Sequence, residues 1–218
     1  MATNTRNDTV NALTYGEFAP CDRFQAWSTM PGQGATVTFR FMDAAPEYAT
    51  DSKKNGFAAL TDAQKALTRL AFQEWAAVAN LTFVEVSDDG DGGQIRFGRN
   101  HIQSAGVLGY RYTPPAAGRD HHINGDAAGD IYLNANNAAV TNAEQGNYGY
   151  WVYVREIGHS LGLKHPGNYD NDPADGPFLP DAEDHTGNTI MSYNPQNSDA
   201  PAEGSYNVGA YDALAVQY

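Results

Sequence analysis

Apolar and polar residues alternate along several short segments of the chain, and this alternation is typical of half-buried β-strands. In residues 34–42, Val37, Phe39 and Phe41 fall on one side and predict the first strand. The same reasoning predicts further strands at 81–86, 94–99, 109–114 and 129–134.

In three other segments the apolar residues recur at the spacing of an α-helix. Thr61 and Gln64 form a capping-box pattern before a run in which Leu67, Leu70 and Trp75 share one face, which predicts an amphipathic helix over 61–79. A second helix is predicted from about 141 to 164, and residues 210–218 are expected to begin a third.

The remaining segments carry little regular pattern. Residues 1–30 are expected to form a loosely structured lead-in, and residues 166–218 to form a loop-rich part built mainly of Pro, Gly, Asn and Asp. The order of strands and helices predicts one α+β domain over 1–218, with a cleft where the regular and loop-rich parts meet.

Composition narrows the function classes. The chain has 218 residues and a net charge of −13, which argues against a nucleic-acid-binding surface. No apolar run is long enough to span a bilayer, and residues 1–18 contain no apolar stretch of signal-peptide type. The single cysteine, Cys21, leaves no intrachain disulfide.

Residues 155–167, REIGHSLGLKHPG, carry the candidate chemistry. Arg155 and His159 are four residues apart and share one face of a helix. Gly162 can end the helix in a sharp turn that returns His165 toward His159, so that two imidazoles could meet one Zn²⁺ ion. Glu156 lies beside them and could serve as general base.

These residues, with Asn188–Tyr193 downstream, resemble the metzincin zinc metalloproteases, whose pattern is H-E-x-x-H-x-x-G-x-x-H followed by a methionine turn. The segments GHSLGLKHPG, AEDHTGNTIMSYN and YDALAVQY resemble the serralysin branch of secreted bacterial proteases. The resemblance implies a zincin-like domain with a twisted, mostly parallel sheet, an antiparallel edge strand and two long helices. It also implies a secreted, monomeric endopeptidase acting on extended polypeptides, with a Ca²⁺-binding β-roll expected after residue 218.

The resemblance assigns roles residue by residue. His159 and His165 match zinc ligands, Glu156 matches the general base, and Met191 matches the turn methionine beneath the metal. Tyr193 matches a tyrosine that ligates zinc and stabilises the oxyanion. The edge strand expected to pair with substrate matches Gly129, Asp130, Ile131, Tyr132, Leu133 and Asn134.

Arg155 departs from the pattern, because the family has a zinc-binding histidine there. A guanidinium is permanently protonated and offers no lone pair, so Arg155 cannot bind zinc and could instead block the metal position or pair with Glu156. We therefore expect the peptidase activity of this chain to be lost or weakened. Either one histidine was changed in an otherwise active protease, or the chain is a noncatalytic pseudoprotease that binds peptide or inhibitor in the same cleft. A weaker alternative is other metal chemistry through His159, His165 and Tyr193.

Other polar clusters have less specific patterns. His121 and His122, among several aspartates, and the Asn/Asp-rich run 168–184 could hold Ca²⁺, although both compositions are also typical of solvated turns. His185 could in principle replace the missing zinc ligand.

Overall fold

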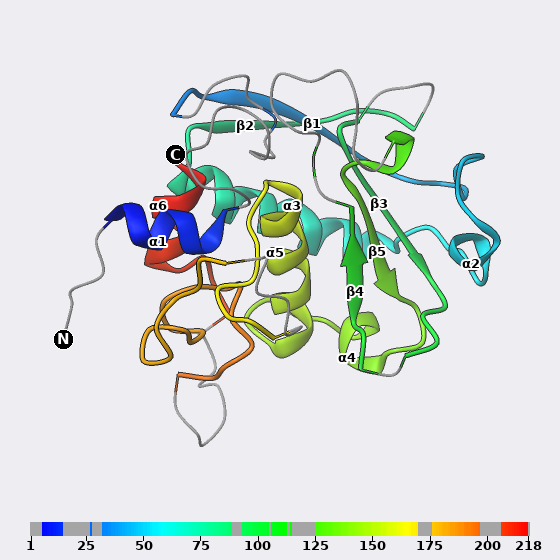
Figure 1. Ribbon diagram of the computed structural model, residues 1–218. Helices are drawn as coiled ribbons and strands as arrows, with labels where there is room; N and C mark the ends of the chain where they lie inside the picture. Colours follow the sequence, from blue (N-terminus) through cyan, green and yellow to red (C-terminus); the bar gives the residue numbers. More distant parts are fainter. Residues whose placement is uncertain are drawn as a thin grey trace.

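The fold is that of a computed structural model, which describes residues 6–14, 27, 32–88, 93–104, 106–112, 114, 125–169, 176–196 and 206–217. A five-stranded sheet lies beside two long helices, which confirms the predicted α+β class (Figure 1). The strands are β1 (Ala35–Phe41), β2 (Leu81–Glu85), β3 (Ile95–Asn100), β4 (Gly109–Arg111) and β5 (Asp130–Asn134).

The sheet order is β2-β1-β3-β5-β4. The first four strands in this order are parallel, and only β4 runs antiparallel, with Gly109 opposite Leu133 and Arg111 opposite Ile131. The predicted antiparallel edge strand is therefore present, and it is β4 rather than residues 129–134.

Two long helices cover one face of the sheet. In α3 (Asp62–Val78) the expected capping box is present, with Thr61 accepting from the Gln64 backbone N–H and Gln64 accepting from that of Thr61. Phe72 of α3 stacks on Phe39 of the sheet with ring centroids 4.2 Å apart. Trp75 donates its indole N–H to the Val154 carbonyl of the second helix at 2.9 Å, which joins the two helices inside the core.

The second helix is shorter than predicted at both ends. The segment 141–164 was expected to be continuous, but it divides into the end of α4 (Ala138–Thr141) and α5 (Tyr148–Ser160). Gly146 has a φ of 83°, which interrupts the helix, and the side chain of Asn147 then caps α5 by accepting from the Tyr150 N–H at 3.0 Å.

The prediction of a loosely structured lead-in is wrong for residues 6–13, which form helix α1 (Arg6–Leu13). It lies beside the last helix, α6 (Ala210–Val216), which ends two residues earlier than predicted (Figure 1). The Leu13 carbonyl accepts from the Lys164 N–H at 2.8 Å, so α1 also ties down the segment that follows α5. Two short elements complete the described structure, α2 (Asp51–Lys54) and the 3₁₀ turn Gly125–Ala127.

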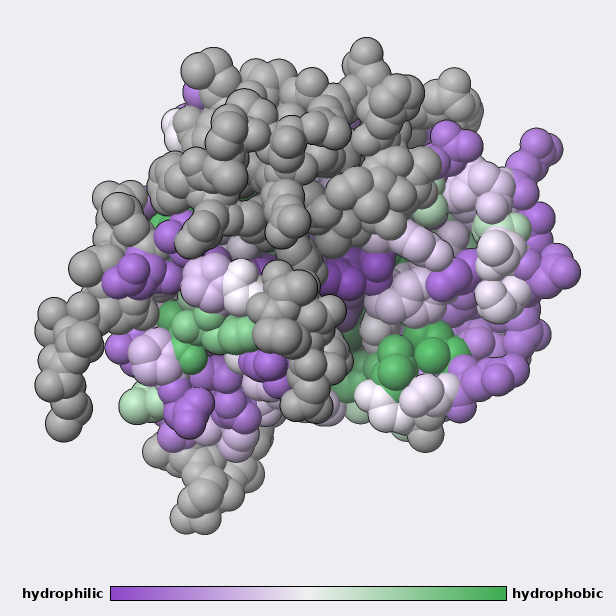
Figure 2. Space-filling model, viewed as in Figure 1, coloured by the Kyte–Doolittle hydropathy of each residue, from purple (hydrophilic) through white to green (hydrophobic). Residues whose placement is uncertain are grey.

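Polar residues dominate the described part of the face in Figure 2, with a small apolar patch near the α4 end of the sheet. Among the described residues, no helix is both long and apolar enough to cross a membrane.

The methionine turn is fixed to α6 by one carboxylate. Asp212 is fully buried and accepts from the Thr189 hydroxyl at 2.5 Å, the Ile190 N–H at 2.7 Å and the Gly209 N–H at 2.7 Å. Burial raises the pKa of Asp212 to about 6, while the hydrogen bonds from Thr189 and from the two N–H groups oppose that rise. The three donors favour the ionised form of the carboxylate, which holds the loop in place.

We predict that Asp212→Ala lowers the free energy of unfolding at pH 7 by about 3 kcal/mol or more, because three buried donors lose their acceptor. Chemical denaturation measures this loss. The control is Asp181→Ala, an exposed turn aspartate, which should change stability by no more than about 0.5 kcal/mol. Equal stability of the two variants would contradict the anchoring role of Asp212.

Candidate active site

Helix α5 supplies three of the candidate residues and is held in place by close packing. A Cβ atom at Gly158 would lie 2.7 Å from Trp75 and 2.9 Å from the Met191 sulphur, distances too short for any side chain. Only glycine lets α5 approach both α3 and the methionine turn this closely. Met191, fully buried, thus lies against the middle of the helix that carries Arg155, Glu156 and His159.

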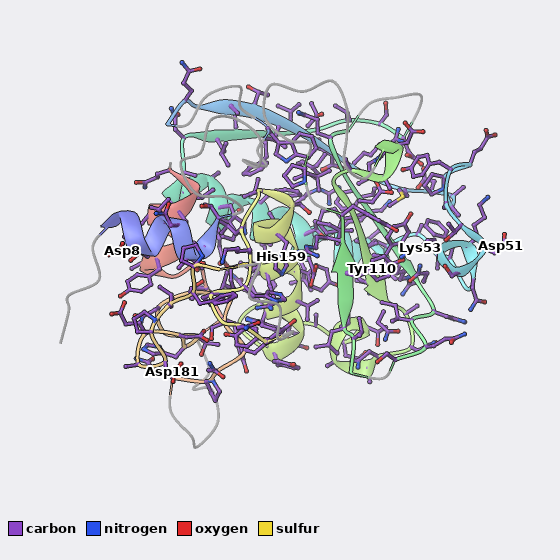
Figure 3. The ribbon with its side chains drawn as sticks, viewed as in Figure 1. Asp8, Asp51, Lys53, Tyr110, His159 and Asp181 are labelled. Carbon is purple, nitrogen blue, oxygen red and sulfur yellow. The ribbon has the colours of Figure 1, made fainter. Side chains whose placement is uncertain are left out.

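Gly162 turns the chain as expected. Its φ is 101°, and the Leu163 N–H donates to Gly158 while the Gly162 N–H donates to His159, which is the Schellman pattern of a helix end. The turn brings His165 back to α5, where its Nε2 lies 3.2 Å from Nε2 of His159. Figure 3 labels His159 on α5, beside the strand that carries Tyr110.

Both imidazoles are held neutral. Burial, followed by the charges of Arg111 and Arg155, lowers the pKa of His159 well below its ordinary value. Burial and the same two cations lower the pKa of His165 to about 3. Nδ1 of His159 donates to the Leu163 carbonyl at 2.8 Å, so its Nε2 keeps the lone pair that faces His165.

Arg155 lies inside the site with only 2% of its surface exposed. Its guanidinium carbon is 4.1 Å from the Tyr193 ring centroid and 4.7 Å from that of Trp151. Nη1 donates to the Ile190 carbonyl at 3.3 Å and to the Ser192 carbonyl at 3.4 Å. The side chain thus lies between two aromatic rings and against the methionine turn.

Glu156 is also buried, and it does not pair with Arg155: within the described residues no ion pair joins the two. Burial raises the pKa of Glu156, and the charges of Arg111 and Arg155 lower it. Its Oε2 has no hydrogen-bond partner among the described residues. Arg111 is a further charged residue near the site that the sequence did not single out. The alternation in β4 puts it on the same side as Gly109, whose added Cβ would lie 3.4 Å from Glu156.

Tyr193 is the exposed wall of the site, with 52% of its surface accessible and its ring 5.0 Å from that of His165. Its backbone N–H donates to the Tyr169 hydroxyl, which in turn donates to Asp184 at 2.5 Å. No local pattern singles out Tyr169 or Asp184, because their contacts depend on how the loop 176–196 folds.

The prediction that residues 129–134 form the substrate-pairing edge is wrong. β5 is hydrogen-bonded to β3 on one side and to β4 on the other, and its residues Asp130–Asn134 are all buried. The edge that borders α5 is β4, which leaves Gly109–Arg111 as the strand beside the cleft. The composition of 129–134 is that of a strand but does not reveal that β4 pairs with its outer side, and this tertiary pairing is the physical reason for the error.

The donor set does not fit a catalytic zinc site while Arg155 is present. Two imidazole nitrogens 3.2 Å apart suit adjacent tetrahedral positions, which lie about 3.3 Å apart around zinc. Catalytic zinc needs three protein ligands, and in the described part of the chain no three His, Cys, Asp or Glu side chains are grouped to hold a metal. His185 does not fill the gap, since its Nε2 contacts Asn188. The loop with His121 and His122, and residues 170–175, lie outside the described residues.

Comparison with known proteins shows the family of the chain. The profile of the matrixin family matches residues 36–171. Serralysin C of Dickeya chrysanthemi is 34% identical over 196 residues, covering 85% of this chain and 39% of that protein. Metalloprotease AprA of Pseudomonas entomophila (strain L48) is 33% identical over 174 residues, covering 77% of this chain and 34% of that protein. The chain spans little more than a third of the length of these relatives. Since the family profile covers more than half of it, the chain belongs to the matrixin family and is a serralysin-like metzincin catalytic domain.

Proposed function

We propose that this chain is a metalloendopeptidase domain for extended polypeptides whose metal centre is disabled by Arg155. The observation that carries the proposal is the buried guanidinium, held by the carbonyls of Ile190 and Ser192. A permanent cation there supplies no ligand and repels a divalent metal. We also propose that the protein is secreted and that the site depends on zinc when histidine stands at position 155. Both parts of the proposal are supported by the family membership.

The rest of the site supports descent from a working peptidase. His159 and His165 are neutral and face each other, and Glu156 is buried beside them without a partner for its Oε2. Tyr193 lies at the mouth of the site, and β4 borders it. When three imidazoles are present, bound zinc supplies Lewis-acid chemistry and an acidic bound water. In this proposal Glu156 accepts a proton and Tyr193 donates a hydrogen bond, which is supported by the burial of Glu156 beside the two histidines and by the 5.0 Å between the rings of Tyr193 and His165.

A noncatalytic pseudoprotease is the second candidate function. It is favoured by the way Arg155 is accommodated, because two carbonyls and two ring faces receive the guanidinium. Cation–π contacts of desolvated guanidinium groups contribute about 2 kcal/mol. A cleft that tolerates Arg155 this well could still bind peptide without cutting it.

We predict that Arg155→His gains one equivalent of zinc and at least about a hundredfold in kcat/KM on casein-derived peptides, because it supplies a third imidazole and removes the cation. Zinc content is measured by elemental analysis and cleavage by a fluorogenic peptide assay.

Two controls separate these effects. Arg155→Gln removes the charge without adding a ligand and should not gain stoichiometric zinc. The double variant Arg155→His with Glu156→Gln should bind zinc and cleave poorly, because the proton acceptor is gone. A zinc-loaded Arg155→His protein that cuts no peptide would refute the peptidase proposal and leave the pseudoprotease.

The position of Arg155 can be tested without metal. We predict that Arg155→Gln raises the pKa of His165, which is about 3 in the wild type, because one of the two cations that disfavour protonation is removed. NMR titration of the imidazole carbons in chelator measures the change. Arg69→Gln alters the same charge far from the site, on the ion pair with Glu85, and should leave the pKa of His165 where it was. A His165 that titrates identically in all three proteins would place Arg155 elsewhere.

A further inference from the structure

The methionine turn leads directly into Tyr193, and the residues on both sides of this tyrosine are hydrogen-bonded to one buried group. Asp184, with 5% of its surface exposed, accepts from the Ser192 hydroxyl at 2.7 Å and from the Asn194 side-chain amide at 3.0 Å. The Asn194 backbone N–H donates to the Ser192 hydroxyl oxygen at 3.0 Å. Ser192 and Asn194 are therefore both tied to Asp184.

Tyr169 connects Tyr193 itself to the same carboxylate. The Tyr169 hydroxyl donates to Asp184 at 2.5 Å, accepts from the Tyr193 backbone N–H at 3.2 Å and lies 3.1 Å from the Ser192 hydroxyl. A phenol hydroxyl has one proton and can also accept, so giving the proton to Asp184 leaves the oxygen to accept from Tyr193. Asp184 thus orients the Tyr169 hydroxyl, and that hydroxyl holds the backbone of Tyr193.

The rings of the two tyrosines are also in contact. Their centroids lie 4.8 Å apart, and the His165 ring lies 5.7 Å from that of Tyr169 and 5.0 Å from that of Tyr193. Gly167 packs against the same group, because a Cβ atom there would overlap the Asp184 carboxylate and lie 2.6 Å from the Tyr169 ring. The segment that carries His165 and the residue Tyr193 therefore share one support.

We propose that Tyr169 is a positioning residue, which holds Tyr193 at the mouth of the site. The Tyr193 side chain needs such support, because 52% of its surface is exposed and a ring with this exposure can turn into solvent. The catalytic meaning of the inference rests on the proposed function, in which the Tyr193 hydroxyl donates a hydrogen bond to the substrate. A donor that is already held in place needs no reorganisation during the reaction.

The positioning role is tested first on the wild-type chain in chelator, by NMR measurement of the hydrogen exchange of backbone amides. We expect Tyr169→Phe, which keeps the ring and removes the hydroxyl, to speed exchange of the Tyr193 amide about fivefold or more. The Ile190 amide, whose acceptor lies in α6, should keep its rate. The matched control is Tyr211→Phe, which removes a hydroxyl that donates to Glu183 at 2.8 Å and should alter neither amide.

Three results of the exchange measurement would overturn the inference. The first is an unchanged rate for the Tyr193 amide in Tyr169→Phe. The second is equal acceleration of the Tyr193 and Ile190 amides, which would indicate a general loosening of the methionine turn. The third is equal acceleration of the Tyr193 amide by Tyr211→Phe.

A second measurement separates positioning from a loss of stability. In zinc-loaded Arg155→His protein, Tyr169→Phe should lower kcat about fivefold or more and change KM by less than about twofold, because a misplaced donor weakens the reaction more than binding. When Tyr193→Phe is also present, the hydroxyl to be positioned is gone, and Tyr169→Phe should change kcat by less than about twofold. An equal fall of kcat in both backgrounds would contradict the positioning role. If Arg155→His cuts no peptide, the proposed function fails, while the exchange measurement still decides whether Tyr169 positions Tyr193.

Discussion

The contact between Gly158 and its two neighbours, Trp75 and Met191, determines where the active helix lies. A single methyl group there would push α5 away from α3 and from the methionine turn at once. Because α5 packs closely against both α3 and the methionine turn, the directions of its side chains are fixed. Arg155 is therefore directed at the methionine turn, and His159 at His165. Asp212 completes the constraint by holding the turn itself to α6.

Much of the fold could be predicted because its signals are local. The capping box of Thr61 and Gln64, the alternation in β1 and the turn at Gly162 each depend on a few neighbouring residues, and each is present as expected. The wrong predictions concern features that depend on tertiary contacts. Residues 129–134 have the composition of a strand, but nothing local distinguishes an edge strand from a central one.

The residues of the candidate site likewise fall into two groups, those that the local sequence predicts and those that it does not. Glu156, His159 and His165 could be named from their spacing, and the turn at Gly162 brings the two histidines together. Arg111 could not be named, because its approach to α5 follows from the pairing of β4 with β5, and Arg111 precedes the end of α5 at Ser160 by 49 residues. The sequence also left open whether Arg155 pairs with Glu156 or fills the space beside it. The aromatic faces of Trp151 and Tyr193 and the carbonyls of Ile190 and Ser192 favour the second arrangement.

The replacement at position 155 fits because the surrounding groups stabilise positive charge. Backbone carbonyls and the negative faces of aromatic rings attract a guanidinium as they would attract any other cation. Neutral imidazoles add no repulsion, and the carboxyl of Glu156 lies on the adjacent position of the helix. A guanidinium can therefore stand where a metal cation would otherwise lie without loss of the fold. The packing at Gly158 and the hydrogen bonds of Asp212 do not depend on the charge at position 155. The exchange does change what the cleft can bind. A guanidinium offers no lone pair and no vacant coordination position, so the same packing that holds Arg155 in place leaves the site without a third metal ligand.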